Sequence, residues 1–360
     1  MHTDRPGPWV VLSQTDQRRW GGDLRRHHVM RQLAIRTAAV GVAGVDRPAV
    51  RDSTRRAAGP PWPWRRRPRL ASSELLTPGA VVLARRMTRP VAVDLHDHVI
   101  AQADALGRNV SDEYRAAQTG RIAANLELFP WVVVPSASFA DLVGLDRARI
   151  IVAPNGSETT HVQPRPVQGP PAIGFASGAA PGRGIETLIA AARLVRVEVP
   201  DLRLYLWLAA VDGPSEAYVE GLRTTCGADP WVTIGGVPYA ELSDALGRAR
   251  VLLVPHPANA YLDVAVPIKL IDSMAAGRPV VVTPRLETRR IVEAAQAGLV
   301  AADDSPAAIA AAVSTLLRDA ELAARLGRNG RAAAERDYDW RVIGDRVADA
   351  VLERVGEGVR

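Results

Sequence analysis

The chain has 360 residues, 47% hydrophobic and 23% charged, a composition typical of a globular protein large enough for two domains. No uninterrupted apolar stretch approaches the roughly 18 residues that cross a bilayer, and the amino terminus lacks the charged start and apolar core of a secretory signal. We therefore expect a cytoplasmic protein. The alternative is a protein of the cytoplasm that also makes peripheral contact with a membrane. The single cysteine, Cys226, excludes an internal disulfide framework and a cysteine-built metal site.

Charge is distributed unevenly along the chain. Residues 1–100 hold 18 Arg against 8 Asp and Glu, a net charge of +10, whereas the remaining residues sum to −4. This asymmetry indicates that the first part faces an anionic partner, such as a membrane surface, a phosphorylated ligand or nucleic acid. An arginine-rich face that is merely solvated is an equal alternative. Only one of the 45 cationic residues is a lysine, Lys269, so that position is informative.

The first part of the chain predicts strands that alternate with helices. The apolar run after Pro8, the glycines Gly21 and Gly22, and the amphipathic segment after them predict strand, glycine turn and helix. Further apolar runs, interpreted as strands with helices between several of them, lie at 35–43, 80–84, 90–97 and 131–136. The segment 55–70, rich in Pro, Trp and Arg, interrupts this pattern, and we expect neither a regular helix nor a central strand there.

A second series of strands and helices follows the proline-rich connector at 163–171. Predicted strands lie at 172–178, 202–210, 232–236, 249–255, 279–283 and 298–302, and predicted helices at 184–199 and 269–276, before an almost wholly helical segment at 305–355. Alternating strands and helices predict parallel sheets covered on both faces. The fold class is therefore α/β, with two Rossmann-like, doubly wound halves that face across a cleft. Ligands of such sheets bind outside the carboxyl ends of the strands, so the cleft between the halves is the expected site.

The stretch 262–283 combines the features that a nucleotide sugar requires. A helix that begins near Pro267 offers backbone amides and the positive end of its dipole to a diphosphate. Lys269, on its first turn, adds a full charge, and the carboxylates of Asp263 and Asp272 suit sugar or ribose hydroxyls.

This stretch resembles glycosyltransferase family 4, a family of retaining enzymes with the GT-B fold. In that family two Glu residues, separated by seven, contact the donor sugar and the ribose. The second acid corresponds to Asp272, but the first position falls on Val264, immediately after Asp263. The resemblance leaves two alternatives: Asp263 takes the role of the missing Glu, or backbone groups from Val264 through Pro267 to Ile268 hold the sugar.

Other segments resemble the same family. The glycines at 21 and 22 correspond to its first glycine loop, where bare backbone approaches the donor and acceptor. Arg183 corresponds to a cation that reaches the diphosphate. The companion arginine is replaced by Gly178, and Lys269 is the candidate substitute.

A histidine of the family lies near the donor sugar, at the end of a strand of the first domain. His96 corresponds to it, with His98 as the alternative and Asp97 placed to orient either ring. A structural role for this histidine is an equal alternative.

The resemblance implies three parts of the chain. They are an acceptor-binding domain over 1–165, a nucleotide-sugar-binding domain over 166–335, and a final helix over 336–360 that packs back on the first domain. No cofactor is expected, because the nucleotide diphosphate sugar is itself the donor substrate. A metal site is not expected either, although Asp337 and Asp339 have the spacing of an Asp-x-Asp motif, because no strand precedes them.

The implied function is the transfer of a hexose-type sugar to an acceptor hydroxyl, with retention of configuration and without a metal. The acceptor stays open among a small molecule, a saccharide and a lipid-linked sugar. The alternatives are a catalytically silent protein that binds nucleotide sugars or partners an active enzyme, and an epimerase on the same fold. Nucleic acid is an unlikely ligand, because the Trp- and Arg-rich segment at 61–69 is also rich in proline.

Overall fold

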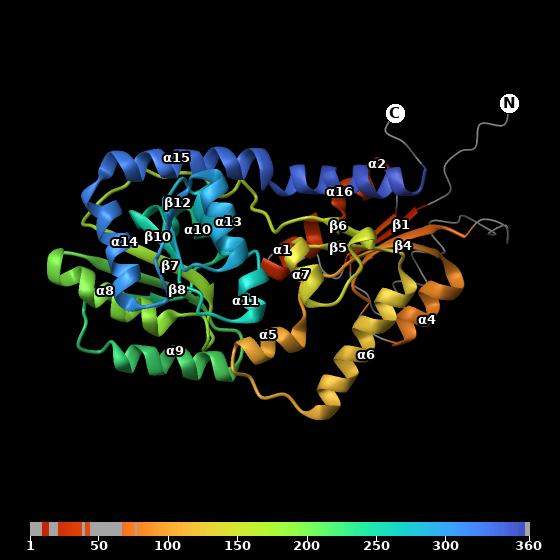
Figure 1. Cartoon of the computed structure of the whole chain (residues 1–360), viewed down its shortest axis with the longest axis horizontal. Helices are drawn as coiled ribbons and strands as arrows, with labels where there is room; N and C mark the ends of the chain where they lie inside the picture. Colours follow the sequence, from red (N-terminus) through yellow and green to blue (C-terminus); the bar gives the residue numbers. More distant parts are fainter. Residues whose placement is uncertain (1–8, 14–20, 38–39, 44–66, 76–77, 357–360) are drawn as a thin grey trace. The chain divides into compact units, whose positions relative to one another are not determined.

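A computed structural model describes most of the chain (Figure 1). The described residues are 9–13, 21–37, 40–43, 67–75 and 78–356. They fall into two compact units: unit 1 comprises Met1–Ala101, Asn109–Pro154 and Trp340–Arg360, and unit 2 comprises Gln102–Arg108 and Asn155–Asp339. Each unit contains a six-stranded sheet in which every pairing is parallel, so the predicted α/β fold with two doubly wound sheets is confirmed.

The sheet of unit 1 has the strand order β2-β1-β3-β4-β5-β6. Its strands are β1 (Trp9–Ser13), β2 (Val40–Ala43), β3 (Arg69–Ser73), β4 (Arg89–Asp94), β5 (Trp131–Val134) and β6 (Ile150–Val152). Its helices are α1 (Gly21–His28), α2 (Arg31–Arg36), α4 (Pro78–Met87), α6 (Asp112–Leu128), α7 (Ala137–Leu142) and α16 (Trp340–Arg354), and α5 (Val99–Ala105) crosses the boundary between the units. The order reverses between β1 and β3, and the carboxyl edge of a doubly wound sheet binds ligands at such a switch point.

Two predictions for unit 1 are wrong, and the strand predicted over 35–43 is a strand only from Val40, since Ile35 and Arg36 end helix α2. The run 80–84, interpreted as a strand, lies inside helix α4, where Ala80, Val81 and Ala84 are buried and Val82 is 49% exposed. A five-residue apolar run does not distinguish a strand from one face of a helix. Arg69 and Leu70, placed in the irregular segment 55–70, begin the internal strand β3, because the last proline of that segment, Pro68, precedes the strand. Residues 55–66 lie outside the described residues.

The sheet of unit 2 has the order β9-β8-β7-β10-β11-β12, with its switch point between β7 and β10. Its strands are β7 (Ala172–Gly178), β8 (Arg203–Ala209), β9 (Val232–Gly235), β10 (Val251–Val254), β11 (Val280–Val282) and β12 (Gly298–Val300). Its helices are α8 (Ile185–Glu198), α9 (Gly213–Thr225), α10 (Leu242–Gly247), α11 (Ala260–Val264), α12 (Ile268–Ala275), α13 (Leu286–Ala295), α14 (Pro306–Arg318) and α15 (Ala320–Asp337).

The core of unit 2 lies on both faces of this sheet. Along β10, Leu253 packs into the cluster that includes Ile185 of α8, whereas Leu252 and Val254 pack into the cluster that includes Leu270 of α12. A strand buried on both faces requires an unbroken apolar sequence, which Val251–Val254 provides. The same packing fixes the start of α8 and the start of α12 beside the switch point.

The last helix, α16, belongs to unit 1. The indole of Trp340 stacks on His28 with a ring-centroid distance of 5.7 Å, and Arg36 of α2 binds Asp345 at 2.7 Å. Asp337 and Asp339 lie just before this helix and have partners in unit 2. Asp337 pairs with Arg336, and Asp339 accepts hydrogen bonds from Thr159. Among the helices that the structure describes, none is long and apolar enough to cross a membrane.

Candidate functional site: a cationic edge of unit 2

The loops after β7 and β10 meet at the switch point of unit 2. Gly184 has φ +77°, and a Cβ built there would lie 1.8 Å from the carbonyl oxygen of Pro255. Only glycine tolerates both the left-handed backbone and this close approach. Gly184 therefore brings the loop that carries Arg183 against the end of β10, next to His256.

Lys269 lies in the middle of this edge. Its Nζ is 3.2 Å from Nε2 of His256 and 5.2 Å from the centroid of the Phe175 ring, a cation–π contact that stabilises the ammonium group. His256 is buried, and its carbonyl oxygen accepts a hydrogen bond from the hydroxyl of Thr283 at the end of β11. The ring of Phe175 in β7 and the imidazole of His256 after β10 thus both lie against the lysine, which is on the first turn of α12.

The electrostatics of this cluster are those of crowded cations. Burial and the charge of Arg183 lower the pKa of Lys269 well below its ordinary value. Burial and the charges of Lys269, Arg183 and Arg285 lower the pKa of His256 in the same way. An anion bound beside these groups would reverse the shift, because a nearby negative charge favours the protonated lysine. The cluster is therefore suited to an anionic ligand.

The amino terminus of α12 adds backbone donors to the same edge. Pro267 is the residue before the first turn, and Ile268 and Lys269 open the helix, where amide groups lack partners within the helix. Asp272 lies one turn further on and is buried, and its Oδ1 accepts no hydrogen bond from the residues that the structure describes. Burial, aided by the charge of Glu158 and opposed by the hydroxyl of Ser157, raises the pKa of Asp272 to about 7.

Asp263 is part of a chain of charges over the ends of β10, β11 and β12. Nη1 of Arg285 binds Oδ1 of Asp263 at 3.1 Å, and its Nη2 binds Oδ1 of Asp304 at 2.6 Å. Asp304 also accepts a hydrogen bond from the backbone amide of Ala258 at 2.7 Å. Arg285 is buried, whereas the Asp263 side chain is 40% exposed. Val264, at the predicted position of the missing acid, is buried at the end of α11.

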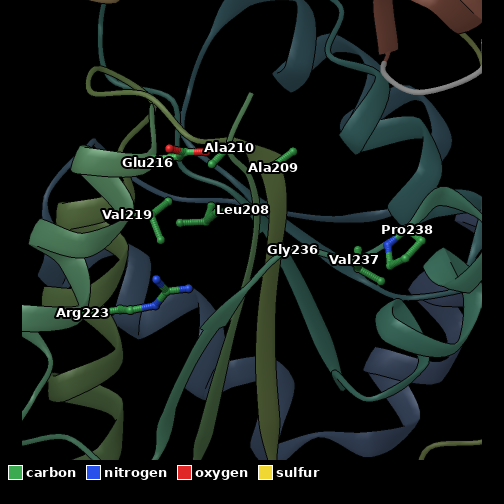
Figure 2. Close-up of a pocket in the computed structure, with 9 residues that line it drawn as sticks. All are labelled: Leu208, Ala209, Ala210, Glu216, Val219, Arg223, Gly236, Val237 and Pro238. Atoms are coloured by element: carbon green, nitrogen blue, oxygen red, sulfur yellow. The ribbon is translucent and has the colours of Figure 1, made fainter. Parts of the chain in front are cut away.

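A cavity of about 480 Å³ continues this edge toward β8 and β9. Figure 2 shows Glu216, Val219 and Arg223 of α9 on one side, with the end of β8 and the turn after β9 lining the rest. The cavity borders the loop that holds Arg183, because Ala209 is the register partner of Gly178 and its carbonyl accepts the amide of Ala179 at 2.9 Å.

The remaining predicted residues lie in unit 1. Gly21 and Gly22 were predicted to form a glycine loop, and this is wrong, because they are the first two residues of helix α1; the residues just before them lie outside the described part. The imidazole of His96 lies between two carboxylates, with Nδ1 3.2 Å from Asp94 and Nε2 3.5 Å from Asp97. His98 instead caps α5, since its Nδ1 accepts the amide of Ala101.

Sequence reasoning missed His256 and Arg285. Each directly follows or lies near the end of a predicted strand, so its position on the carboxyl edge was available from the sequence. The contacts of His256 with Lys269 and of Arg285 with Asp263 could not be predicted, because they depend on which strands are neighbours in the sheet. The order β10-β11-β12 places both residues over adjacent strand ends.

Comparison with known proteins identifies the class of this fold. Residues 170–319, most of unit 2, match the family model described as Glycosyl transferases group 1, and membership of family 4 stays a prediction. The chain has a GT-B fold: the structure of Anabaena HepE in complex with UDP superposes with a TM-score of 0.69 at 17% identity, covering 96% of this chain and all of that one. Sucrose-phosphate synthase from Thermosynechococcus elongatus superposes with a TM-score of 0.60, also at 17% identity, covering 80% of this chain and 74% of that one.

Curated relatives match part of the sequence. A phosphatidyl-myo-inositol mannosyltransferase of Propionibacterium freudenreichii is 32% identical over 171 residues, which are 46% of this chain and 39% of the relative. A GDP-mannose-dependent alpha-(1-6)-phosphatidylinositol monomannoside mannosyltransferase of Mycolicibacterium smegmatis is 30% identical over 187 residues, 51% of this chain and 48% of the relative. The matched part thus spans about half the length of these relatives or less.

Proposed function

We propose that this chain is a glycosyltransferase that binds a nucleotide diphosphate sugar in unit 2 and transfers its hexose-type sugar to an acceptor hydroxyl. The observation that carries the proposal is the convergence of Lys269, Arg183 and His256 at the β7/β10 switch point, beside the amino terminus of α12. The match of residues 170–319 to group 1 glycosyltransferases supports it, as does the UDP bound to HepE.

The cations would act on the leaving group. Cleavage of the bond between sugar and diphosphate transfers negative charge to the diphosphate, and preorganised positive groups stabilise that charge where it develops. Lys269, Arg183 and the amides of Ile268 and Lys269 supply such groups. Because they provide the stabilisation that a divalent ion gives in other enzymes, the proposed reaction requires no metal.

The other predicted residues receive roles from their positions. Asp272, with a buried acceptor oxygen one helical turn from Lys269, would bind ribose hydroxyls. The sugar would contact Asp263 or the loop from Val264 to Ile268. The cavity beside α9 would hold the nucleoside. Two to three strand spacings, roughly 10–15 Å, separate β10 from β8 and β9, so a ligand with its diphosphate at the end of β10 would extend its nucleoside to this cavity.

Retention of configuration completes the proposal. The acceptor hydroxyl would attack from the face that the diphosphate leaves, and a diphosphate oxygen would take its proton, so no side chain is assigned as general base. His96 of unit 1 is proposed to contact the reacting sugar, as its family counterpart does.

The test is incubation of the full chain with UDP- and GDP-hexoses, in the presence and absence of a chelator, with a panel of saccharide and lipid acceptors. Release of the nucleoside diphosphate and the anomeric proton coupling of the product are measured. We expect chelator-insensitive release and a product with the donor's configuration. An inverted product or strict metal dependence would refute those parts of the mechanism, and nucleotide binding without transfer or hydrolysis would identify a catalytically silent protein.

A further inference from the structure

Lys269 and His256 form a pair of basic groups that can hold only one added proton in the observed geometry. Nζ of the lysine lies 3.2 Å from Nε2 of the imidazole, which is a hydrogen-bond distance. A charged ammonium group and a charged imidazolium group are both donors without an acceptor. If both residues were charged, two N–H donors would oppose each other, so the pair is either neutral or singly charged.

The geometry of the pair is fixed by the elements around it. His256 is 2% exposed, and its carbonyl oxygen accepts a hydrogen bond from the hydroxyl of Thr283. Lys269 lies on the first turn of α12, and its carbonyl oxygen accepts the hydroxyl of Ser273 at 2.7 Å. Its Nζ also lies 5.2 Å from the ring centroid of Phe175. Because both backbones are anchored, the imidazole sets the position of the lysine nitrogen through Nε2.

The charged groups that act on the pair are cations. Every residue of unit 2 is described. Within this unit, Arg183 acts on both members of the pair and Arg285 acts on His256, while burial disfavours a charge on either. These effects lower the pKa of the lysine and of the imidazole well below their ordinary values. The pair is therefore neutral in the free chain over part of the pH range in which an isolated lysine is charged.

The acids around the pair contact other groups. Carboxylates on the neighbouring elements are Glu186 of α8, Asp263 of α11, Asp272 of α12, Glu287 of α13 and Asp304 after β12. Asp263 and Asp304 bind Arg285, Glu186 binds Tyr218, and Glu287 binds Arg290. The carboxyl of Asp272 has a pKa raised to about 7 by burial. Unit 2 itself thus places no carboxylate against the pair, and a bound diphosphate would supply the anion.

We propose that Nε2 of His256 positions Lys269 as its hydrogen-bond acceptor, and that the pair takes up one proton from solvent when the diphosphate group of the donor binds. The inference rests on the function proposed above and adds proton-linked donor binding to it. In the neutral pair, the lysine amine donates one N–H to Nε2. The proton adds to the lone pair of Nζ, and the ammonium group keeps its bond to Nε2 while its other two N–H groups donate to phosphate oxygens. The imidazole stays neutral, with its hydrogen on Nδ1.

The direction of the pH dependence follows from this proton balance. The complex holds one proton more than the free chain and the free ligand, so the affinity for the donor is greatest below the pKa of the free pair. The affinity falls as pH rises from the pKa of the free pair to the pKa of the occupied pair, by at most about tenfold per pH unit for one proton. A cation that cannot lose its proton would give no such dependence.

The test uses the fact that Lys269 is the only lysine in the chain. The full chain is labelled with ¹³C-lysine, and its single Cε signal is titrated by NMR from about pH 7 to pH 11, alone and with saturating UDP or GDP. We expect the midpoint in the free chain to lie below the value of about 10.4 for an unperturbed lysine. With the nucleotide, the midpoint should rise by about one pH unit or more. The terminal phosphate of the nucleotide, with a second pKa of about 6, stays ionised over this range.

Two variants of His256 separate positioning from a merely structural role. His256→Gln introduces an amide oxygen that can accept from Nζ, so the rise of the lysine midpoint with nucleotide should remain. His256→Leu removes the acceptor, so the rise should be largely lost and the affinity for the nucleotide should fall about tenfold. The matched control is His161→Leu, at the other histidine of unit 2, whose Nε2 lies 2.8 Å from the carbonyl oxygen of Tyr239. Its lysine titration and nucleotide affinity should equal those of the parent.

The possible failures are distinguishable. A nucleotide that raises the melting temperature but leaves the lysine midpoint unchanged would overturn the proton uptake and leave the proposed function standing. A midpoint of about 10.4 in the free chain, or equal behaviour of His256→Leu and the parent, would also overturn the inference. No rise of the melting temperature with either nucleotide would refute the donor site and, with it, the inference. If His256→Leu does not fold, the titrations of the parent and of His256→Gln decide the question.

Discussion

The carboxyl edges of the two sheets share a topology but differ in charge. At the switch point of unit 2, Lys269, Arg183 and His256 meet, and the pKa of the lysine is lowered by burial and by its cationic neighbour. At the carboxyl end of β4 in unit 1, Arg25 and Asp94 neutralise each other.

This difference shows that the side chains at the carboxyl edge, and not the strand topology, determine which ligand a doubly wound sheet binds. The strands place both edges equally well, and the crowded cations of unit 2 suit its edge to a diphosphate. Four changes test this contrast, beginning with the largest expected effect.

Gly184→Ala should disrupt the contact between the two loops of unit 2. The left-handed backbone and the overlap with the carbonyl of Pro255 should lower the free energy of unfolding by about 3–5 kcal/mol. Chemical denaturation measures this loss. Gly178→Ala is the matched control, because its Cβ meets nothing within 4 Å and its φ is not positive, so a large loss in both variants would contradict the explanation.

Lys269→Ala should lower turnover at saturating donor by about 100-fold, the effect of losing one preorganised charge-stabilising group. Steady-state release of nucleoside diphosphate measures it. Arg289→Ala, which removes an exposed cation of α13 paired with Glu293, should change turnover less than twofold. Equal activity of the lysine variant and the parent chain would show that the lysine is incidental to the reaction.

Asp272→Asn should change how stability depends on pH. Since the carboxyl has a pKa of about 7 in the folded chain and about 3.9 when unfolded, its contribution is fully present below pH 4 and is lost as pH rises through 7. The asparagine variant should therefore be more stable than the parent at pH 8, by up to about 4 kcal/mol, and not at pH 4. Thermal unfolding of the parent and the variant between pH 4 and pH 8 tests this prediction. Parallel curves of melting temperature against pH would contradict the raised pKa of Asp272.

Arg285→Met should weaken the interaction of unit 2 with the donor sugar without unfolding the unit. Losing the bridge between Asp263 and Asp304 frees the loop after β10, so kcat/KM for the nucleotide sugar should fall about tenfold, equivalent to about 1.4 kcal/mol. Affinity for the nucleoside diphosphate alone should fall less. An equal loss for both ligands would assign Arg285 to the diphosphate instead of to the sugar.

Much of the fold was predictable from the sequence, because its strands are short apolar runs bounded by glycine and proline. The runs around Val132, Leu253 and Val281 became strands as predicted. The run at 80–84 became a helix, since its burial follows helical spacing that five residues are too few to reveal.

The candidate sites were predictable only where their residues are close in the sequence. Lys269 and Asp272 share one helix, and the rarity of lysine drew attention to it. The Arg25–Asp94 pair joins residues 69 positions apart, and the Arg285 bridge joins three strand ends. Such contacts follow from strand order and register, which short-range patterns do not specify.

The most direct test of the central claim is the melting temperature of the full chain with excess UDP or GDP, compared with inorganic pyrophosphate, in the parent and in Lys269→Ala. A ligand that binds only the folded state raises the melting temperature by mass action. We predict a rise with a nucleoside diphosphate, a smaller rise with pyrophosphate, and loss of both in the variant. No rise with either nucleotide, or an equal rise in the variant, would contradict a diphosphate site at the cationic edge of unit 2.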